Sequence, residues 1–163
     1  MSTYNAATGS SSGGLTTSMM NGFFRLRKTF KLADLVASLK AGVAFTTSDI
    51  INAFYIPANT LVLGVGCIVH VAEGAACTIG VGDTSSTSGY LNAVNLNSTS
   101  TSVWTGHTLP YGVDNMLGKL YTAAGTIDIL VNSAATDAAV FTLTALCVDL
   151  GQNDYKKPPL DKN

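Results

Sequence analysis

The clearest pattern in the chain is an alternation of apolar and polar positions within residues 49–83. Every second side chain of a β-strand faces the same side. Over residues 60–72 this rule predicts a strand with one apolar row directed toward a core, made of Leu61, Leu63, Val65, Cys67, Val69 and Val71. The opposite side carries Gly64, Gly66 and His70, so we expect a second sheet or subunit to approach closely there.

The flanking segments predict further strands separated by turns. We expect strands over residues 49–56 and 76–82, a chain reversal at 57–59 and a hairpin loop at 73–75. Proline fixes its own φ and asparagine tolerates turn conformations, which suits the sequence Pro-Ala-Asn at 57–59.

The second half of the chain continues the pattern at short spacing. Strands are expected over residues 90–96, 116–123, 126–132 and 140–150, with a helical turn as the alternative for the first. Their inward rows include Ile127, Ile129, Val131, Phe141, Leu143, Ala145 and Cys147. Short strands with polar turns and little helix predict an all-β fold. We expect an antiparallel β-sandwich, jelly-roll-like, with an extended N-terminal arm.

The pattern divides the chain into three regions: an extended arm (1–40), a β-sandwich body (41–150) and a polar C-terminal tail (151–163). Residues 1–22 are uncharged and of low complexity, and alone they bury too little apolar area to fold. They are either a floppy terminus or an arm that orders against a partner. Residues 23–40 predict a basic strand followed by a turn or short helix, which Gly42 ends.

Charged residues are scarce and unevenly distributed. They make up 12% of the chain, compared with roughly 25% in an average soluble domain. A surface so poor in charge promotes association, although a plain β-domain is the alternative interpretation. Residues 1–40 carry a net charge of +4 and residues 41–150 a net charge of −6. This asymmetry suits a front end that docks on an acidic surface, such as the body of a neighbouring copy.

Candidate reactive chemistry is sparse. The three cysteines lie in apolar rows without metal-site spacing, so we expect buried free thiols and synthesis in a reducing cytosol. His70 and His107 have no carboxylate or cysteine nearby in the sequence, and Asp83 and Asp114 lack the spacing of a calcium loop. We therefore predict no catalytic residue, no cofactor, no metal and no membrane span.

Two groups of residues are candidates for binding a partner. The first lies in the basic strand and consists of Phe23, Phe24, Arg25, Arg27, Lys28 and Lys31. Nucleic acid is the weaker interpretation for it, because no aromatic-rich groove accompanies the basic groups. The second is aromatic and consists of Tyr90, Trp104, Tyr111 and Tyr121. These aromatics suit either a sugar-binding surface or the interior of a sandwich.

Several stretches resemble small structural proteins of tailed bacteriophages. They are IPANTLVLGVG (56–66), EGAACTIGVGD (73–83), YLNAVNLN (90–97) and GKLYTAAGTIDILVNSAATDAAVFTLTALCVDL (118–150). The resemblance covers residues 49–150 and contains no catalytic signature. It implies a capsid decoration (cement) protein or another minor virion component. Such proteins have a sandwich or tulip-like body, often form trimers and clamp capsomers with extended arms.

Together these features predict a non-enzymatic virion structural protein that decorates the capsid exterior after synthesis in the host cytoplasm. Its expected partners are the major capsid protein and other copies of itself, with a homotrimer favoured, and the N-terminal arm makes the contacts. The alternative is a head or tail fibre module that binds host-surface glycans. A minor hydrolase is a third interpretation.

Overall fold

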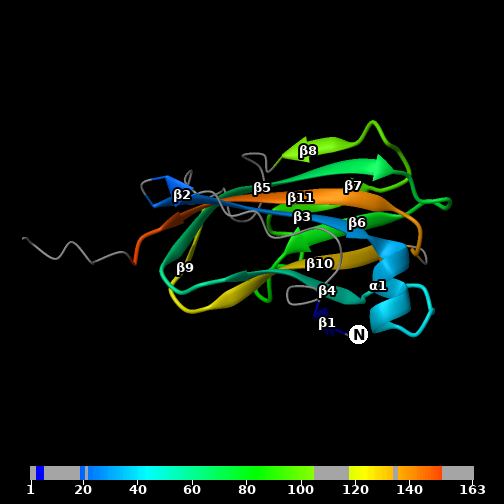
Figure 1. Cartoon of the computed structure of the whole chain (residues 1–163), viewed down its shortest axis with the longest axis horizontal. Coiled ribbons are helices and arrows are strands. Elements are labelled where there is room, and N and C mark those ends of the chain that lie inside the picture. The colour runs from blue at the N-terminus through cyan, green and yellow to red at the C-terminus, as the bar shows by residue number, and fades with distance from the viewer. Residues whose placement is uncertain (1–2, 6–18, 21, 105–117, 134–135, 152–163) are drawn as a thin grey trace, which may run out of the picture.

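Two β-sheets pack face to face and enclose one hydrophobic core (Figure 1). The structure is a computed structural model that describes residues 3–5, 19–20, 22–104, 118–133 and 136–151. In their order across the sheet, the strands of the five-stranded sheet are β1 (Thr3–Asn5), β4 (Ile50–Ile56), β10 (Gly125–Ser133), β6 (Thr78–Gly82) and β7 (Leu91–Asn95). Those of the six-stranded sheet are β2 (Met19–Met20), β3 (Phe23–Lys31), β11 (Val140–Asp149), β5 (Thr60–Val71) and β8 (Ser102–Trp104), with β9 (Lys119–Tyr121) also paired to β5. The predicted antiparallel sandwich is confirmed, although β1 pairs with β4 in parallel.

The basic strand near the front of the chain is an integral part of the sandwich. β3 pairs with β11 without interruption, from Lys31 opposite Val140 to Phe23 opposite Val148. It is held there because its inward side chains fill the core alongside those of the other sheet. The folded body therefore begins ahead of residue 41, where the sequence pattern places the end of the arm.

The predicted short helix follows β3 directly. Helix α1 (Leu32–Leu39) buries Leu32, Leu35 and Val36 in the core. It ends where Ala41 and Gly42 adopt positive φ values of 50° and 87°. The Gly42 N–H donates to the Val36 carbonyl oxygen at 3.0 Å, which satisfies one of the last carbonyls of the helix.

Strand β5 does not keep one inward row along its whole length. Its centre follows the prediction, with Val65, Cys67 and Val69 buried. However, the pairing with β11 skips Leu63 and later His70, which marks two β-bulges. Each bulge adds a residue and so reverses the side that the next positions face. At the start of the strand Val62 fills the core instead of Leu61 or Leu63, and at its end Val71 is exposed.

The predicted hairpin at residues 73–75 is wrong, because β5 and β6 lie in different sheets. The turn at 57–59 is present, with Asn59 at a φ of 60°, and it likewise carries the chain from one sheet to the other. Alternation identifies the inward side of a strand. Both sheets face the same core, so alternation does not tell which sheet the strand joins.

The predicted inward rows of β10 and β11 are confirmed as buried, and so are the three free thiols, Cys67, Cys77 and Cys147. Burial raises the pKa of Cys67 and of Cys147 to about 12. The thiols therefore stay protonated and act as small apolar groups in the core.

Candidate functional site

The outward side of the six-stranded sheet forms a surface that we call the open face. The inward residues of β3 and β11 are buried, so the alternate residues point outward. The open face consists of Phe23, Arg25, Arg27, Thr29, Lys31, Gly64, Gly66, Ile68, His70, Trp104, Thr142, Thr144 and Leu146. One row of paired residues crosses it from Arg27 through Thr144 and Gly66 to Trp104.

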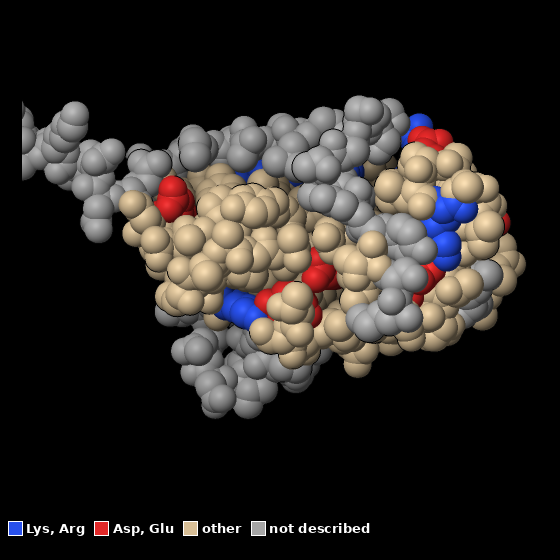
Figure 2. Space-filling view, turned by 90° about the horizontal axis from the view of Figure 1, so that it is seen from below, with Lys and Arg blue, Asp and Glu red and all other residues tan. Residues whose placement is uncertain are grey.

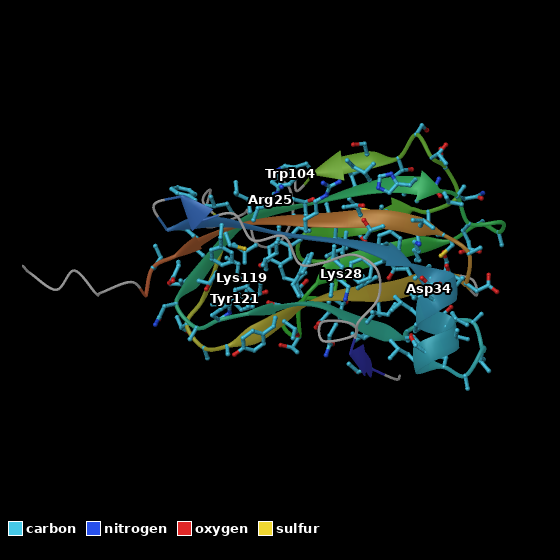
Figure 3. The ribbon with its side chains drawn as sticks, in the orientation of Figure 1. Arg25, Lys28, Asp34, Trp104, Lys119 and Tyr121 are labelled. Carbon is cyan, nitrogen blue, oxygen red and sulfur yellow. The ribbon has the colours of Figure 1, made fainter. Side chains whose placement is uncertain are left out.

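Trp104 lies across two glycines of the open face. A Cβ on Gly64 would come within 2.9 Å of the Trp104 Cζ2, and one on Gly66 within 2.4 Å of its Cε3. The indole thus rests on backbone that carries no side chain, while 53% of the residue stays exposed at the edge of the sheet (Figure 3). A close approach does occur at these glycines, but it is made by β8 of the same sheet and not by the second sheet or subunit that was predicted. The group that approaches comes from the same chain, and the sequence gives no signal for its identity.

A groove of about 630 Å³ lies beside Trp104, between β7 and β8. Among the described residues, none that lines the groove is charged; its polar groups are amides and hydroxyls, including those of Asn92, Asn95, Ser98, Ser100 and Ser102. Trp104 and Val103 supply exposed apolar surface on the β8 side of the groove.

The structure separates the predicted basic contact residues into two groups. Phe23, Arg25, Arg27 and Lys31 are exposed. Phe24 and Lys28 lie in the row of β3 that faces the core, which removes them from the exposed contact set. Figure 3 shows Lys28 between β3 and the strands of the other sheet.

Lys28 is 4% exposed, and its Nζ lies 5.4 Å from the centre of the Phe30 ring. Burial lowers the pKa of the Lys28 ammonium group. The aromatic face offers it a partial electrostatic partner inside the sandwich.

Three polar side chains form a hydrogen-bonded row across the open face. The Oγ1 atoms of Thr29 and Thr142 lie 2.8 Å apart, and the His70 Nε2 lies 2.8 Å from the same Thr142 oxygen. His70 is exposed, as its position on β5 predicts, and this row fixes its ring against the sheet. His107 lies outside the described residues.

The outward side of β6 is closed by the chain itself, and we call it the covered face. A Cβ on Gly82 would come within 1.9 Å of the Ser86 carbonyl oxygen, so the loop after β6 lies directly on the strand. Asp83 holds this loop, since its Oδ1 accepts the N–H groups of Ser85 at 2.8 Å and Ser86 at 3.2 Å. Asp128 is buried opposite Gly82, and burial raises its pKa.

The other carboxylate oxygen of Asp83 anchors β9. It accepts hydrogen bonds from the Lys119 ammonium group and from the Tyr121 hydroxyl, the latter at 3.0 Å. The Tyr90 hydroxyl donates in turn to Tyr121 at 3.2 Å. Burial is the main cause of the raised pKa of both tyrosines, so they remain neutral. Figure 3 shows Lys119 and Tyr121 close together at one end of the sandwich.

This arrangement changes the assignment of several candidate residues. Asp83 ties the loop after β6 to β9, which is a structural role. Asp114, the other acid considered and set aside as a calcium ligand, lies outside the described residues. Tyr90 and Tyr121 are buried and do not contribute to a sugar-binding surface. Tyr111 lies outside the described residues, which leaves Trp104 as the exposed member of the aromatic group.

Glu73 is a second buried anchor. Its Oε2 accepts hydrogen bonds from the Thr136 hydroxyl at 2.6 Å and from the N–H groups of Ala138 at 3.1 Å and Ala139 at 3.0 Å. Burial alone raises the pKa of Glu73, but these hydrogen bonds outweigh it and hold the pKa below the usual value. Glu73 thereby fastens the loop after β5 to the loop before β11.

Most of the acids described in the body do not lie at its surface. Residues 41–150 contain seven acids, of which the structure describes six, and four of these are buried, namely Asp49, Glu73, Asp83 and Asp128. Asp49 accepts a hydrogen bond from Lys40 at 2.6 Å, within an ion pair of the same kind as that of Asp83. Figure 2, seen from below, shows uncharged residues over most of the described surface on that side, with acidic and basic groups in small clusters.

Within the described ranges, no group of three or more His, Cys, Asp or Glu residues lies close enough to hold a metal ion. A search of the same residues finds no helix with the length and hydropathy needed to cross a membrane.

Comparison with known proteins finds relatives in fold only. No protein-family model and no curated protein matches the sequence. A chain of the cyanophage Pam1 capsid asymmetric unit is similar, with a TM-score of 0.53 and 21% identity over 87% of this chain and 96% of that one. A chain of the Ralstonia phage GP4 capsid has a TM-score of 0.59 and 14% identity over 91% and 98%. A chain of the acid-stable capsid of Helicobacter pylori bacteriophage KHP30 has a TM-score of 0.51 and 12% identity over 82% and 93%.

The likeness spans nearly the whole length of each matched chain. At these identities it shows a shared fold. It agrees with the resemblance of the sequence to structural proteins of tailed phages.

Proposed function

We propose that this chain is a non-enzymatic structural protein of a bacteriophage virion and that it decorates the outside of the capsid shell. The observation that carries the proposal is the fold, which matches chains of three phage capsids over 93% to 98% of their length. Asp83 and Glu73 support the non-enzymatic part of the proposal, because both carboxylates serve to fasten loops and strands of the sandwich together.

The partners in this proposal are the major capsid protein and further copies of the chain, with a trimer favoured. A low charge content suits a protein that hides much of its surface in an assembly. Many identical copies on one lattice also bind with avidity, so each contact can be individually weak. The N-terminal arm adds contacts to neighbouring chains in this proposal.

Purified particles of the phage that encodes this chain test the proposal. Quantitative mass spectrometry is expected to find the chain at a fixed ratio to the major capsid protein in particles banded on a density gradient. Its absence from such particles, with the protein present in the infected-cell lysate, would contradict a virion role.

Glycan binding is a second candidate function, supported by the groove beside Trp104. An exposed indole next to amides and hydroxyls, with no charge among the described lining residues, has the chemistry of a neutral sugar site. A glycan array is expected to show specific binding that Trp104→Ala abolishes and Tyr55→Thr, on the other sheet, leaves intact. An array without specific binding excludes this candidate.

A further inference from the structure

The composition of the open face differs from that of an ordinary solvated sheet. The solvent side of an antiparallel sheet normally carries polar residues. Here large apolar residues are exposed, namely Phe23, Ile68, Trp104 and Leu146, and they lie next to three cations, Arg25, Arg27 and Lys31. Neither Asp nor Glu occurs at the described outward positions of β3, β11, β5 and β8. Exposed apolar surface combined with charge of a single sign is typical of a binding surface.

We propose that the open face binds a carboxylate-bearing surface of another protein, with Trp104 as the apolar anchor and Arg25 and Arg27 as ion-pair donors. The proposal rests on the proposed function, in which that protein is a chain of the capsid shell. It adds the surface through which this chain docks and the chemistry of the surface that receives it.

The geometry places the anchor and the cations within one interface. Arg27 and Trp104 belong to the same row of paired residues, three strand spacings apart, or about 14 Å. Arg25 lies two residues along β3 on the same side. This span fits easily inside a typical interface of about 800 Å² per partner.

Trp104 is suited to act as an anchor because it is already held in place. Its ring rests on the backbone at Gly64 and Gly66, so it loses little side-chain freedom when a partner covers it. Tryptophan and arginine are also the residues that most often dominate the binding energy of protein interfaces.

Charge complementarity favours a different protein over a second copy of this chain. Four of the acids in the body are buried within the fold. Among the described residues the exposed acids are Asp34 on α1 and Asp137 in the loop before β11. A second copy therefore offers the open face few carboxylates from its described surface. Nucleic acid is a poorer fit, because backbone recognition requires a longer track of cations than the three found here.

Shells prepared from a phage deletion mutant that lacks this chain provide the test. The purified full-length chain is added back, and binding is measured by co-sedimentation over a range of salt concentrations. Two variants alter the open face, Trp104→Ala and the double variant Arg25→Glu/Arg27→Glu. Tyr55→Thr is the matched control, because Tyr55 is an exposed aromatic residue on the opposite sheet. Circular dichroism and thermal melting establish that each variant is folded.

Each open-face variant is expected to weaken binding about 30-fold or more, and the control to stay within about twofold. Binding of the wild-type chain should also weaken as salt rises. Arg25→Lys/Arg27→Lys, which keeps both charges on the folded sheet, should retain most of the affinity.

Each contrary result has a distinct meaning. If the wild-type chain does not bind the shells, the proposed function fails and this inference fails with it. If it binds, but the open-face variants bind equally well and Tyr55→Thr does not, the docking face is wrong while the proposed function stands. If the arginine variant instead loses binding to a single-stranded oligonucleotide and keeps its affinity for shells, the open face is a nucleic-acid surface and the inference is overturned.

Discussion

Glycine serves opposite purposes on the two outer faces of the sandwich. On the covered face, the absence of a Cβ at Gly82 lets the backbone of the following loop lie directly against β6. On the open face, the absence of a Cβ at Gly64 and Gly66 lets one aromatic ring lie flat on β5 while half of it stays exposed. A loop whose backbone lies against a strand covers the outer side of that strand. A single side chain that lies against a strand leaves its own outer surface exposed to a partner.

The charged residues of the two faces also differ, in that those of the covered face are buried and those of the open face are exposed. Asp83 and Asp128, which lie at or beside the covered face, are buried within the fold. Arg25, Arg27 and Lys31 on the open face are exposed. Asp83 is therefore occupied in holding the fold together, Asp128 is removed from the surface by burial, and the exposed bases are placed to contact another molecule.

Alanine at Gly82 should break the covered face and produce the largest loss of stability. The new Cβ would meet three backbone atoms of the loop, at 1.9, 2.6 and 2.8 Å, and backbone cannot move aside locally. We expect Gly82→Ala to lower the free energy of unfolding by about 3 kcal/mol or more, measured by urea denaturation. Gly74→Ala is the control, because no atom lies within 4 Å of its Cβ position. Equal stability of the two variants would show that the loop does not rest on β6.

Removal of the Asp83 charge should have the next largest effect. Asp83→Asn takes away the anionic partner of Lys119 and weakens the hydrogen bond from the Tyr121 hydroxyl. We expect a loss of about 2 kcal/mol in the free energy of unfolding, since hydrogen bonds to a buried charge are the strong ones. Asp137→Asn, at an exposed acid, should stay within about 0.5 kcal/mol. Unchanged stability of Asp83→Asn would remove the structural role assigned to this carboxylate.

Acid should destabilise the protein through Glu73. Its pKa is held below the usual value in the folded state, so its contribution to stability is complete above the ordinary pKa of glutamate and is lost as the pH falls through the folded-state value. We expect Glu73→Gln to reduce the difference in unfolding free energy between neutral and acid pH by about 1 kcal/mol. The variant should still lose some stability in acid, because the pKa of Asp49 is also lowered in the folded state. A variant with the same pH profile as the wild type would contradict the assignment.

Alanine at Gly66 should sharpen the comparison with Gly82, because here the obstacle is a side chain. The new Cβ would come within 2.4 Å of the Trp104 ring, and the ring can swing outward at the sheet edge. We expect a loss of less than about 1 kcal/mol. The chain has a single tryptophan, so its fluorescence should report the displaced ring by a shift in the emission maximum. An unshifted spectrum would mean that Trp104 does not rest on Gly66.

The local sequence pattern predicts most strands and their inward sides, but it predicts little about which segments contact one another in three dimensions. The alternation places Ile127, Ile129 and Val131 correctly because β10 keeps one inward row. The alternation fails at Leu63, where a β-bulge reverses the side that the residues face. The pairing of β5 with β11 fixes this bulge, and β11 is distant from β5 in the sequence. The glycines of β5 indicate a close approach, but nothing local identifies Trp104 as the group that approaches.

The candidate site shows the same limit for charge. Phe23, Arg25, Arg27 and Lys31 form an exposed edge of the open face, whereas Lys28 shares the inward side of the same strand and is buried. Net charge sums over the chain regardless of depth, so it gives the body an acidic character to which four buried acids contribute without reaching the surface. Burial depends on the tertiary fold, so only the structure reveals which acids are buried.

The most direct test of the proposed docking is an electron cryomicroscopy map of the intact particle in which this chain is located. We expect the open face to lie against the shell, with Trp104 covered and carboxylates of the neighbouring protein beside Arg25 and Arg27. A map in which the side carrying Tyr55 meets the shell, and Trp104 faces solvent, would contradict it.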